Sequence, residues 1–339
     1  MKKIIFFELT EQEKGILEKY PDFLELIDFT QEKLSLENVS QYVDYEIVSV
    51  FIGSQLSQEV LKQLKNLKFI ATRSTGFDHI DLSYCKDNNI LVSNVPDYGE
   101  HTVAEYTFAL LLCLIRKVYD AYHQVRETGS FSLEGLQGRE LYEKILGVIG
   151  VGKIGREVIK IAKGFSMKVI AYDKYPQEEL ARQLGFEYVD LENLLSVSDV
   201  ISLHVPHNKE THHLINKDNI FKTKPGCYII NTARGGIIET QALYEAIKNN
   251  HLGGAALDVL EEEGDLKEEQ RMLMEKQDIP SEKLKILLAN HVFIDLDNVI
   301  VSPHNAFNTQ EALENIIIKT IENIKQFKLS KPINLIKNK

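Results

Sequence analysis

The sequence has little cysteine and no long apolar segment, and both shortages narrow the classes of protein it can belong to. Its three cysteines are Cys85, Cys113 and Cys227, and no two of them have CxxC spacing. This sparse, odd number excludes a disulfide framework and is typical of a reducing compartment, where such residues usually serve as small buried hydrophobic side chains. The longest apolar run covers residues 108–115 and suits a buried helix, because a membrane span needs ~20 residues.

Positive charge is also scarce. Lysine and arginine total 39 against 50 acidic residues, which gives a formal net charge of -11. Such a balance argues against a general binder of nucleic acid or of anionic membranes. The N-terminal apolar run, IIFF, is too short for a signal peptide. We therefore expect a cytoplasmic protein with a small-molecule ligand, no nucleic-acid partner, no membrane partner and no metal.

What the sequence does contain is a regular alternation of short apolar runs and amphipathic stretches with helical spacing. This rhythm predicts βαβ units and an α/β fold with parallel, doubly wound sheets. Residues 145–149 are apolar at nearly every position, as in a strand that is covered on both faces. The expected strands are residues 4–7, 47–51, 69–71, 90–93, 145–149, 168–172, 200–203, 227–231, 254–258 and 299–301.

The order of these elements predicts two domains, one of them discontinuous. Four strand–helix pairs precede Asn94, one long apolar helix is expected at 106–126, and a fresh series starts at residue 144. A last helix at 309–327 is expected to return to the first domain. We thus predict one domain from residues 1–100 completed by 303–339, and a second from 101–302. The charged segment 261–285 is expected to be a solvated loop–helix insertion.

The second series opens with the glycine pattern Gly150-Val-Gly152-Lys-Ile-Gly155, set between a strand and a helical stretch. In a dinucleotide-binding fingerprint, the first glycine allows a tight turn and the second lets the backbone approach the pyrophosphate. The third permits close packing of helix on strand, and the helix N-terminus faces the phosphates. The alternative is a glycine-rich turn in an α/β protein that binds no nucleotide.

Asp173 completes the fingerprint 18 residues after Gly155, at the end of the next strand. Its carboxylate can accept hydrogen bonds from the ribose hydroxyls, and its charge would repel a 2′-phosphate. NAD is therefore the expected cofactor rather than NADP. Lys174 beside it weakens that preference slightly.

Three later strands are each followed by a candidate catalytic residue: Arg234, Asp258 and His304. The carboxyl ends of parallel strands lie at one edge of a sheet, so these residues should converge. Reduction of a 2-keto acid needs a proton donor, which suits histidine, and a planar cation for the carboxylate, which suits arginine. Glu263 is the candidate partner for the histidine. Taken singly, each residue also has an interpretation without a catalytic role. His304 could be a turn residue, Arg234 could form a surface ion pair, and Glu263 could be a solvated acid.

The chain resembles the D-isomer-specific 2-hydroxyacid dehydrogenase family over most of residues 45–320. The matching segments read TRSTGFDHID, NVPDYGEHTVAEYTFALLL, GVIGVGKIG, VISLHVPHNKETHHLIN, INTARGG, ALDV and SPHNAF. The resemblance implies a Rossmann NAD domain inserted in a flavodoxin-like substrate domain, an active site in the cleft between them, and a homodimer formed through the cofactor domain. It also implies that Arg234, Glu263 and His304 are catalytic.

The resemblance implies further site residues. Beyond the glycines, the cofactor contacts fall on Val103, Lys153, Ile154, Asp173, Val205, Pro206, Thr211, Thr232, Ala233, Arg234 and Asp258. The substrate contacts fall on Ser74, Thr75, Gly76, Tyr98, Arg234, His304 and Phe307. Backbone amides of 74–76 would bind the substrate carboxylate, for which Gly76 permits a close approach.

Tyr98 and Phe307 look most like the D-lactate dehydrogenase branch, in which an aromatic wall closes a small pocket, so we expect reduction of pyruvate to D-lactate. Arg73 is the one additional cation that the loop offers, which disfavours a phosphorylated substrate. The alternatives are a glyoxylate/hydroxypyruvate reductase, a branched-chain 2-keto acid reductase, and a non-enzymatic NADH-sensing protein similar to the family's corepressors.

Overall fold

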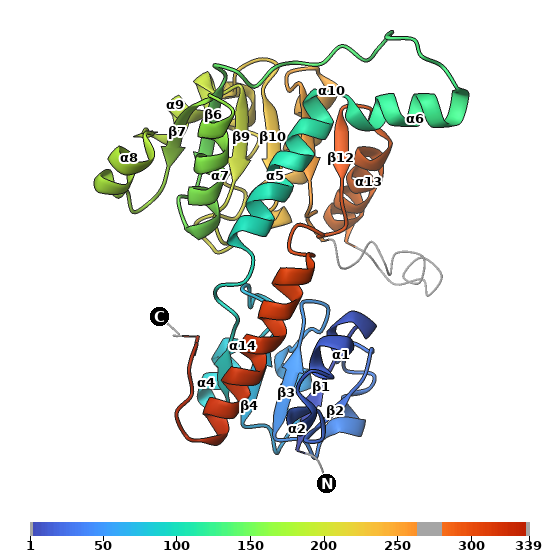
Figure 1. Ribbon diagram of the computed structural model, residues 1–339, viewed down its shortest axis with the longest axis vertical. Coiled ribbons are helices and arrows are strands. Elements are labelled where there is room, and N and C mark those ends of the chain that lie inside the picture. The colour runs from blue at the N-terminus through green and yellow to red at the C-terminus, as the bar shows by residue number, and fades with distance from the viewer. Residues whose placement is uncertain (1–2, 263–279, 337–339) are drawn as a thin grey trace. The chain divides into compact units, whose positions relative to one another are not determined.

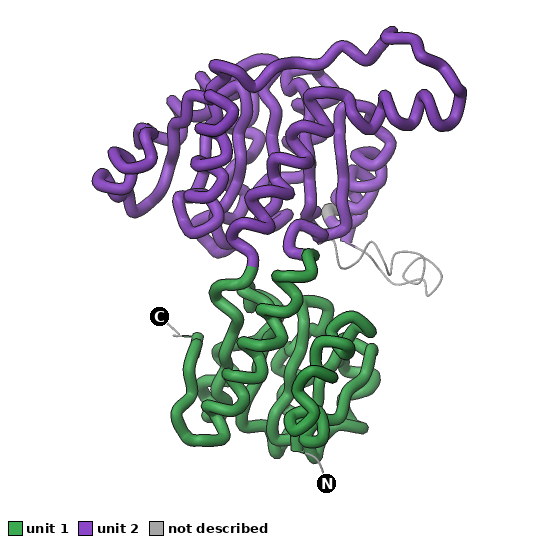
Figure 2. The backbone as a smooth tube through the Cα atoms, in the orientation of Figure 1, with its two compact units in different colours: residues 1–98, 308–339 green, residues 99–307 purple. Residues whose placement is uncertain are grey.

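A computed structural model describes residues 3–262 and 280–336. The chain divides into two compact units, one formed by residues 1–98 with 308–339 and the other by residues 99–307 (Figure 2). Each unit contains one parallel β-sheet, so the predicted α/β class is confirmed. No helix within the described residues is long and apolar enough to cross a membrane.

The first unit is built on a five-stranded parallel sheet with strand order β2-β1-β3-β4-β5. Its strands are β1 (Ile4–Phe6), β2 (Ile27–Phe29), β3 (Ile47–Val50), β4 (Phe69–Thr72) and β5 (Leu91–Ser93). Its helices are α1 (Glu11–Leu17), α2 (Pro21–Leu24), the 3₁₀ turn η1 (Val39–Tyr42), α3 (Gln58–Leu61), α4 (Leu82–Asp87) and α14 (Gln310–Lys328).

Helix α14 joins this unit from the far end of the sequence (Figure 1). Thr309 caps its N-terminus by accepting a hydrogen bond from the amide of Ala312. Its buried isoleucines, among them Ile317 and Ile321, share a core cluster with residues of β1, β3 and β4. The ring of Phe327 also stacks on Phe69 with centroids 4.3 Å apart. One face of the first sheet is therefore completed by the last helix of the chain.

The second unit carries a seven-stranded parallel sheet with strand order β12-β11-β10-β9-β6-β7-β8. Its strands are β6 (Ile145–Ile149), β7 (Lys168–Tyr172), β8 (Glu187–Tyr188), β9 (Val200–Leu203), β10 (Tyr228–Asn231), β11 (Gly254–Leu257) and β12 (Val299–Val301). Its helical segments are α5 (Glu100–Ile115), α6 (Val118–Thr128), α7 (Lys153–Gly164), α8 (Glu178–Leu184), α9 (Leu191–Val197), η2 (Ile220–Lys222), η3 (Gly235–Ile237), α10 (Thr240–Lys248) and α13 (Ser281–Asp295).

Both faces of this sheet are covered. Helices α5 and α7 lie side by side over one face (Figure 1), and their buried residues cluster with Val148 and Ile230. Residues of α9, α10 and α13 cluster with Ile149 and Ile229 on the other face. Neighbouring strand residues point to opposite faces, so a strand enclosed on both sides must be apolar throughout.

The single helix expected at 106–126 is wrong, because the structure has two helices there. Helix α5 starts earlier, at Glu100, and ends at Ile115, while α6 starts at Val118. Lys117 between them has a left-handed backbone, with φ of 55°, which ends one helix and redirects the chain into the next. Helix α6 has no buried residue and projects beyond the sheet (Figure 1).

Candidate functional site

The glycine loop joins β6 to α7, and its glycines answer three separate geometric demands. Gly150 has a positive φ of 96°, and a Cβ there would lie 2.6 Å from the carbonyl oxygen of His204. A Cβ on Gly155 would lie 2.1 Å from the carbonyl oxygen of Gly150, so helix and loop are in direct backbone contact. Gly152, the N-cap of α7, has no such neighbour within 4 Å. The open space at Gly152 and the amides of α7 fit the pyrophosphate of a dinucleotide.

Asp173 lies directly after β7 and is bound to the glycine loop. Its Oδ2 accepts a hydrogen bond from the amide of Val151 at 2.7 Å, and its Oδ1 accepts one from Tyr175 at 2.8 Å. The fingerprint acid and the glycine loop are thus connected directly by a hydrogen bond.

The remaining cofactor candidates lie on the loops around this one. Thr211 closes the turn after β9, because its hydroxyl donates to the carbonyl oxygen of Pro206 at 2.5 Å. The hydroxyl of Thr232, at the end of β10, lies 3.0 Å from that of Thr107 on α5, one turn beyond the buried Val103.

Lys153 forms an ion pair with Glu100 at 3.8 Å. The rest of this set is Ile154, which packs against the core, and Val205 and Ala233, which are partly buried.

Asp258 follows β11 and organises the turn that carries His304. The carboxylate accepts hydrogen bonds from the hydroxyl of Ser302 at 2.6 Å and from the amides of Asn305 and Ala306, each at 2.8 Å. The amide of His304 donates to the carbonyl oxygen of Asp258 at 2.8 Å. Burial raises the pKa of Asp258, and these donors partly offset that effect. The two residues are therefore brought together as the sequence predicted.

Arg234 lies on the neighbouring loop, after β10. Its Nη1 donates to the carbonyl oxygen of Ala233 at 2.7 Å, and its own carbonyl oxygen accepts from the side chain of Asn231 at 2.9 Å. A Cβ on Gly235 would lie 2.0 Å from the carbonyl carbon of Leu260. The loop that carries Arg234 is therefore in backbone contact with the segment that follows Asp258.

The substrate candidates are divided between the units. Ser74, Thr75 and Gly76 form the loop after β4, where the Ser74 hydroxyl donates to the carbonyl oxygen of Gly76 at 2.6 Å and that of Thr75 to Val95 at 2.9 Å. Tyr98, also in the first unit, is half-buried. Phe307, in the second, lies edge-on to the ring of His304 with centroids 6.4 Å apart.

Arg73 is not the additional cation that the sequence suggested. The side chain is fully buried and forms an ion pair with Glu13 at 3.0 Å. It also donates to the carbonyl oxygens of Phe7 and Glu8. Its charge is used inside the first unit, which strengthens the expectation against a phosphorylated substrate.

Comparison with known proteins identifies the family to which these features belong. Residues 108–306 match the model of the D-isomer specific 2-hydroxyacid dehydrogenase NAD binding domain. The chain is 41% identical over 281 residues to the D-lactate dehydrogenase of Escherichia coli, which covers 82% of each protein. It is 40% identical over 299 residues to a 2-hydroxyacid dehydrogenase homolog of Zymomonas mobilis, which covers 87% of each.

The chain belongs to the D-isomer-specific 2-hydroxyacid dehydrogenases. Among solved structures it is similar to the D-lactate dehydrogenase of Aquifex aeolicus complexed with NAD and lactic acid. The TM-score is 0.85 at 37% identity, and the match covers 97% of this chain and 96% of the other. The protein is thus an NAD-dependent oxidoreductase that acts on D-2-hydroxy acids.

Glu261 of this dehydrogenase has a structural role that the sequence did not indicate. Its side chain is only 11% exposed, so the expectation of a solvated segment from residue 261 onward is wrong at its first residue. The carboxylate lies 2.7 Å from Nε2 of His213 and accepts from the hydroxyl of Thr240 at 2.7 Å. The side chain of Asn290 donates to the Glu261 carbonyl oxygen at 2.8 Å. Glu261 therefore connects the loop that carries His213 to the helices α10 and α13, whereas Glu263 lies outside the described residues.

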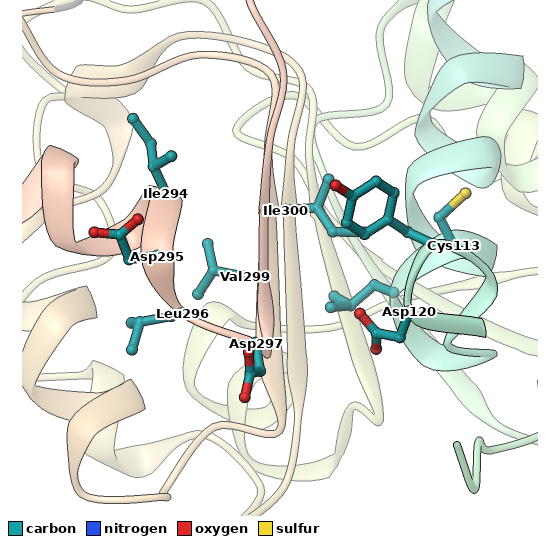
Figure 3. A pocket seen from close by; sticks show the side chains of 10 residues that line it. Cys113, Asp120, Ile294, Asp295, Leu296, Asp297, Val299 and Ile300 are labelled. Carbon is teal, nitrogen blue, oxygen red and sulfur yellow. The ribbon is translucent and has the colours of Figure 1, made fainter. Parts of the chain in front are cut away.

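A pocket of about 150 Å³ in the second unit lies away from the candidate residues (Figure 3). It is lined by Cys113 of α5, Asp120 of α6 and residues 294–297, 299 and 300. Those residues lead into the start of β12, whereas His304 follows the end of that strand. The pocket is therefore at the opposite edge of the sheet from the catalytic candidates. Cys113 is half-buried here, while Cys85 and Cys227 are buried as predicted.

Proposed function

We propose that this dehydrogenase interconverts pyruvate and D-lactate with NADH and NAD. The observation that carries the proposal is the edge-on ring of Phe307 beside His304, which supplies an aromatic wall for a short substrate side chain. The resemblance to proteins named D-lactate dehydrogenase from Escherichia coli and Curvularia clavata, at 41% and 39% identity, supports the same substrate.

His304 would act as the general acid in reduction and as the general base in oxidation. When bound, the nicotinamide supplies a hydride to the keto carbon. His304 then donates a proton to the carbonyl oxygen, which becomes the hydroxyl of the product, and Glu263 stabilises the imidazolium. The fork of Arg234 would hold the substrate carboxylate and keto oxygen through charge-assisted hydrogen bonds. Asp258, through its bonds to 302–306, would hold the histidine in place.

The cofactor would be held by the second unit, and the first would serve as the substrate domain. We assign the pyrophosphate to the glycine loop, because its free space and the helix N-terminus suit that group. The ribose hydroxyls would donate hydrogen bonds to the carboxylate of Asp173. The proposed cofactor residues are Val103, Gly150, Gly152, Lys153, Ile154, Gly155, Asp173, Val205, Pro206, Thr211, Thr232, Ala233, Arg234 and Asp258. Backbone amides of Ser74, Thr75 and Gly76, with Tyr98, would contact the substrate.

A panel of 2-keto acids with NADH tests the substrate. We expect kcat/KM to be highest for pyruvate and to fall with branched or aromatic side chains, because Phe307 limits the space. A relative named aromatic 2-oxoacid reductase, from Clostridium sporogenes, is 37% identical to this chain, so phenylpyruvate belongs in the panel with hydroxypyruvate, glyoxylate and 2-ketoisocaproate. A clear preference for any of these would replace pyruvate, and no turnover of any would favour an NADH-sensing role.

We also propose a homodimer formed through the second unit. Helix α6 buries none of its residues, and its Tyr119 and Tyr122 are 62% and 58% exposed. The following loop exposes Phe131 by 86% and Leu133 by 84%. Several large apolar side chains gathered on one projecting segment are typical of an interaction surface, and a second copy of the chain is the occupant that the family resemblance supports.

A further inference from the structure

An ion pair joins the two loops on either side of the glycine loop. In the seven-stranded sheet, β6 lies between β7 and β9. Lys174 follows β7 and Glu210 follows β9, yet Nζ of the lysine lies 2.6 and 2.5 Å from the two carboxylate oxygens. The pair therefore connects the loops of two strands that flank the strand leading to Gly150.

Both partners of this pair are held by local hydrogen bonds. Asp173 accepts from the amide of Tyr175, which sets the turn at whose centre Lys174 lies. On the other loop, the side-chain oxygen of Asn208 accepts from the amides of Glu210 at 2.8 Å and Thr211 at 3.2 Å. The pairing therefore joins two structured turns, and the partners are adjacent through the fold although 36 positions apart in sequence.

Lys174 lies where its positive charge would weaken the preference for NAD over NADP. It is the residue next to Asp173, the acid that the fingerprint assigns to the ribose hydroxyls, and a basic side chain near that position is what accommodates a 2′-phosphate. The ammonium group is charged near neutral pH, as in any exposed lysine, and the bond to Glu210 raises the pKa of Lys174 further. Asp173 alone would repel a 2′-phosphate, while an unengaged Lys174 would attract it.

We propose that Glu210 is a specificity-determining residue, which engages the Lys174 ammonium group and so denies it to the 2′-phosphate of NADP. The side chains of Lys174 and Glu210 are 55% and 66% exposed, so solvent and salt screen the ion pair. Its effect on discrimination is correspondingly modest and sensitive to salt. Arg156 lies nearby on α7, but its guanidinium group donates to Val151 and Gln177 and is independent of Glu210.

Calorimetric titration with 2′,5′-ADP and with 5′-ADP measures this discrimination without any keto acid, so its outcome is independent of the proposed substrate. In Glu210→Gln we expect about 3- to 10-fold tighter binding of 2′,5′-ADP at low ionic strength, with 5′-ADP within about 2-fold of wild type. The kcat/KM ratio of NADPH to NADH should rise in parallel. The gain should shrink at about 1 M salt, where the Debye length is only ~3 Å.

Two variants separate this role from a general change in charge. Lys174→Met/Glu210→Gln should lose the gain, because no ammonium group remains. Glu179→Gln removes the same charge from another exposed ion pair, with Arg182 at 2.8 Å, and should leave both affinities unchanged. The proposal is overturned if Glu210→Gln leaves the ratio unchanged, if the gain persists in the double variant, or if both nucleotides weaken equally.

Discussion

The backbone amide of His304 donates a hydrogen bond to the carbonyl oxygen of Asp258 over 2.8 Å. His304 has a left-handed backbone, with φ of 52°, a conformation that glycine adopts readily and that asparagine, aspartate and histidine adopt more often than other residues. The turn after β12 is thus held in this shape by the fully buried residue that follows the neighbouring strand, β11. The segments that follow two adjacent strands, β11 and β12, therefore define the position of the proposed proton donor.

Replacement of His304 should abolish most turnover while the cofactor still binds. His304→Asn suits the test, because asparagine tolerates a left-handed backbone better than alanine. Loss of a general acid predicts a fall in kcat of about 10²- to 10⁴-fold. Steady-state kinetics and NADH fluorescence titration measure the two effects. Near-normal kcat would remove His304 from the proposed role.

Asp258→Asn should impair the same turn indirectly. The asparagine side chain keeps only one of the two acceptor oxygens. Its NH₂ group replaces the other and leaves a donor such as the amide of Ala306 without an acceptor. An unsatisfied buried donor costs about 1–3 kcal/mol of stability, so the melting temperature should fall. The value of kcat should fall as well. Ser302→Ala, which removes one donor only, should have a smaller effect. If Asp258→Asn matched wild type in both measurements, the carboxylate would not organise the turn.

Alanine at Gly152 and at Gly155 should separate binding from stability. Gly152 has open space and a φ of -71°, so Gly152→Ala should fold normally yet bind NADH weakly, since the methyl group occupies the expected path of the pyrophosphate. Gly155→Ala forces a Cβ within 2.1 Å of a backbone oxygen and should lower the melting temperature. Equal NADH affinity in Gly152→Ala and wild type would contradict the placement of the pyrophosphate.

Stability should fall as the pH drops below neutrality, in part because of His204. Burial lowers its pKa to about 3, whereas an unfolded histidine titrates near 6.5. Between these values the unfolded chain binds a proton that the folded chain does not, so acidification favours unfolding by at most about 1.4 kcal/mol per pH unit. Since His204 keeps some exposed surface, we expect a shallower slope than this limit.

Denaturant unfolding at pH 7 and pH 5 checks this origin. The loss of stability should be smaller in His204→Gln than in wild type, whereas His123→Gln, at an exposed position on α6, should behave as wild type does. An identical loss in all three proteins would mean that other groups cause the acid sensitivity.

The exposed apolar side chains after α6 predict a change of oligomeric state. Phe131→Asp/Leu133→Asp should shift a dimer toward a monomer, because two charges would be introduced into the proposed contact. Sedimentation velocity at several concentrations measures the mass. As a matched control, Leu36→Asp alters a 53% exposed apolar residue of the first unit and should leave the mass unchanged. A wild-type monomer at high concentration would rule out the interface.

The sequence predicted features that depend on local pattern. Strands such as β6, β7 and β9 fall at the expected residues, because burial on both faces demands an uninterrupted apolar run. The fingerprint was recognisable for a similar reason, since Gly150, Gly155 and Asp173 each make contacts within the same strand–loop–helix segment or the strand next to it. Strands β2 and β8 escaped prediction, because three and two residues are too few to show a period.

Features that depend on distant partners were not predictable from one sequence. Lys117 breaks a helix without glycine or proline, so no local signal marked the joint. Glu261 reads as one of three consecutive acids, and only the fold brings His213 and Thr240 to it. Arg73 looked available beside the substrate loop, but its partner Glu13 lies 60 residues earlier in the chain.

The return of α14 to the first unit constrains the order of events during synthesis. The first 98 residues leave the ribosome long before residues 310–328, which supply one wall of their core and the ring that stacks on Phe69. Domains generally fold as units during translation, so the nascent first unit must wait with an uncovered apolar face while the second is made and folds. Slow decoding or early termination before residue 310 would therefore expose an aggregation-prone intermediate, and chaperones would be expected to engage residues 1–98.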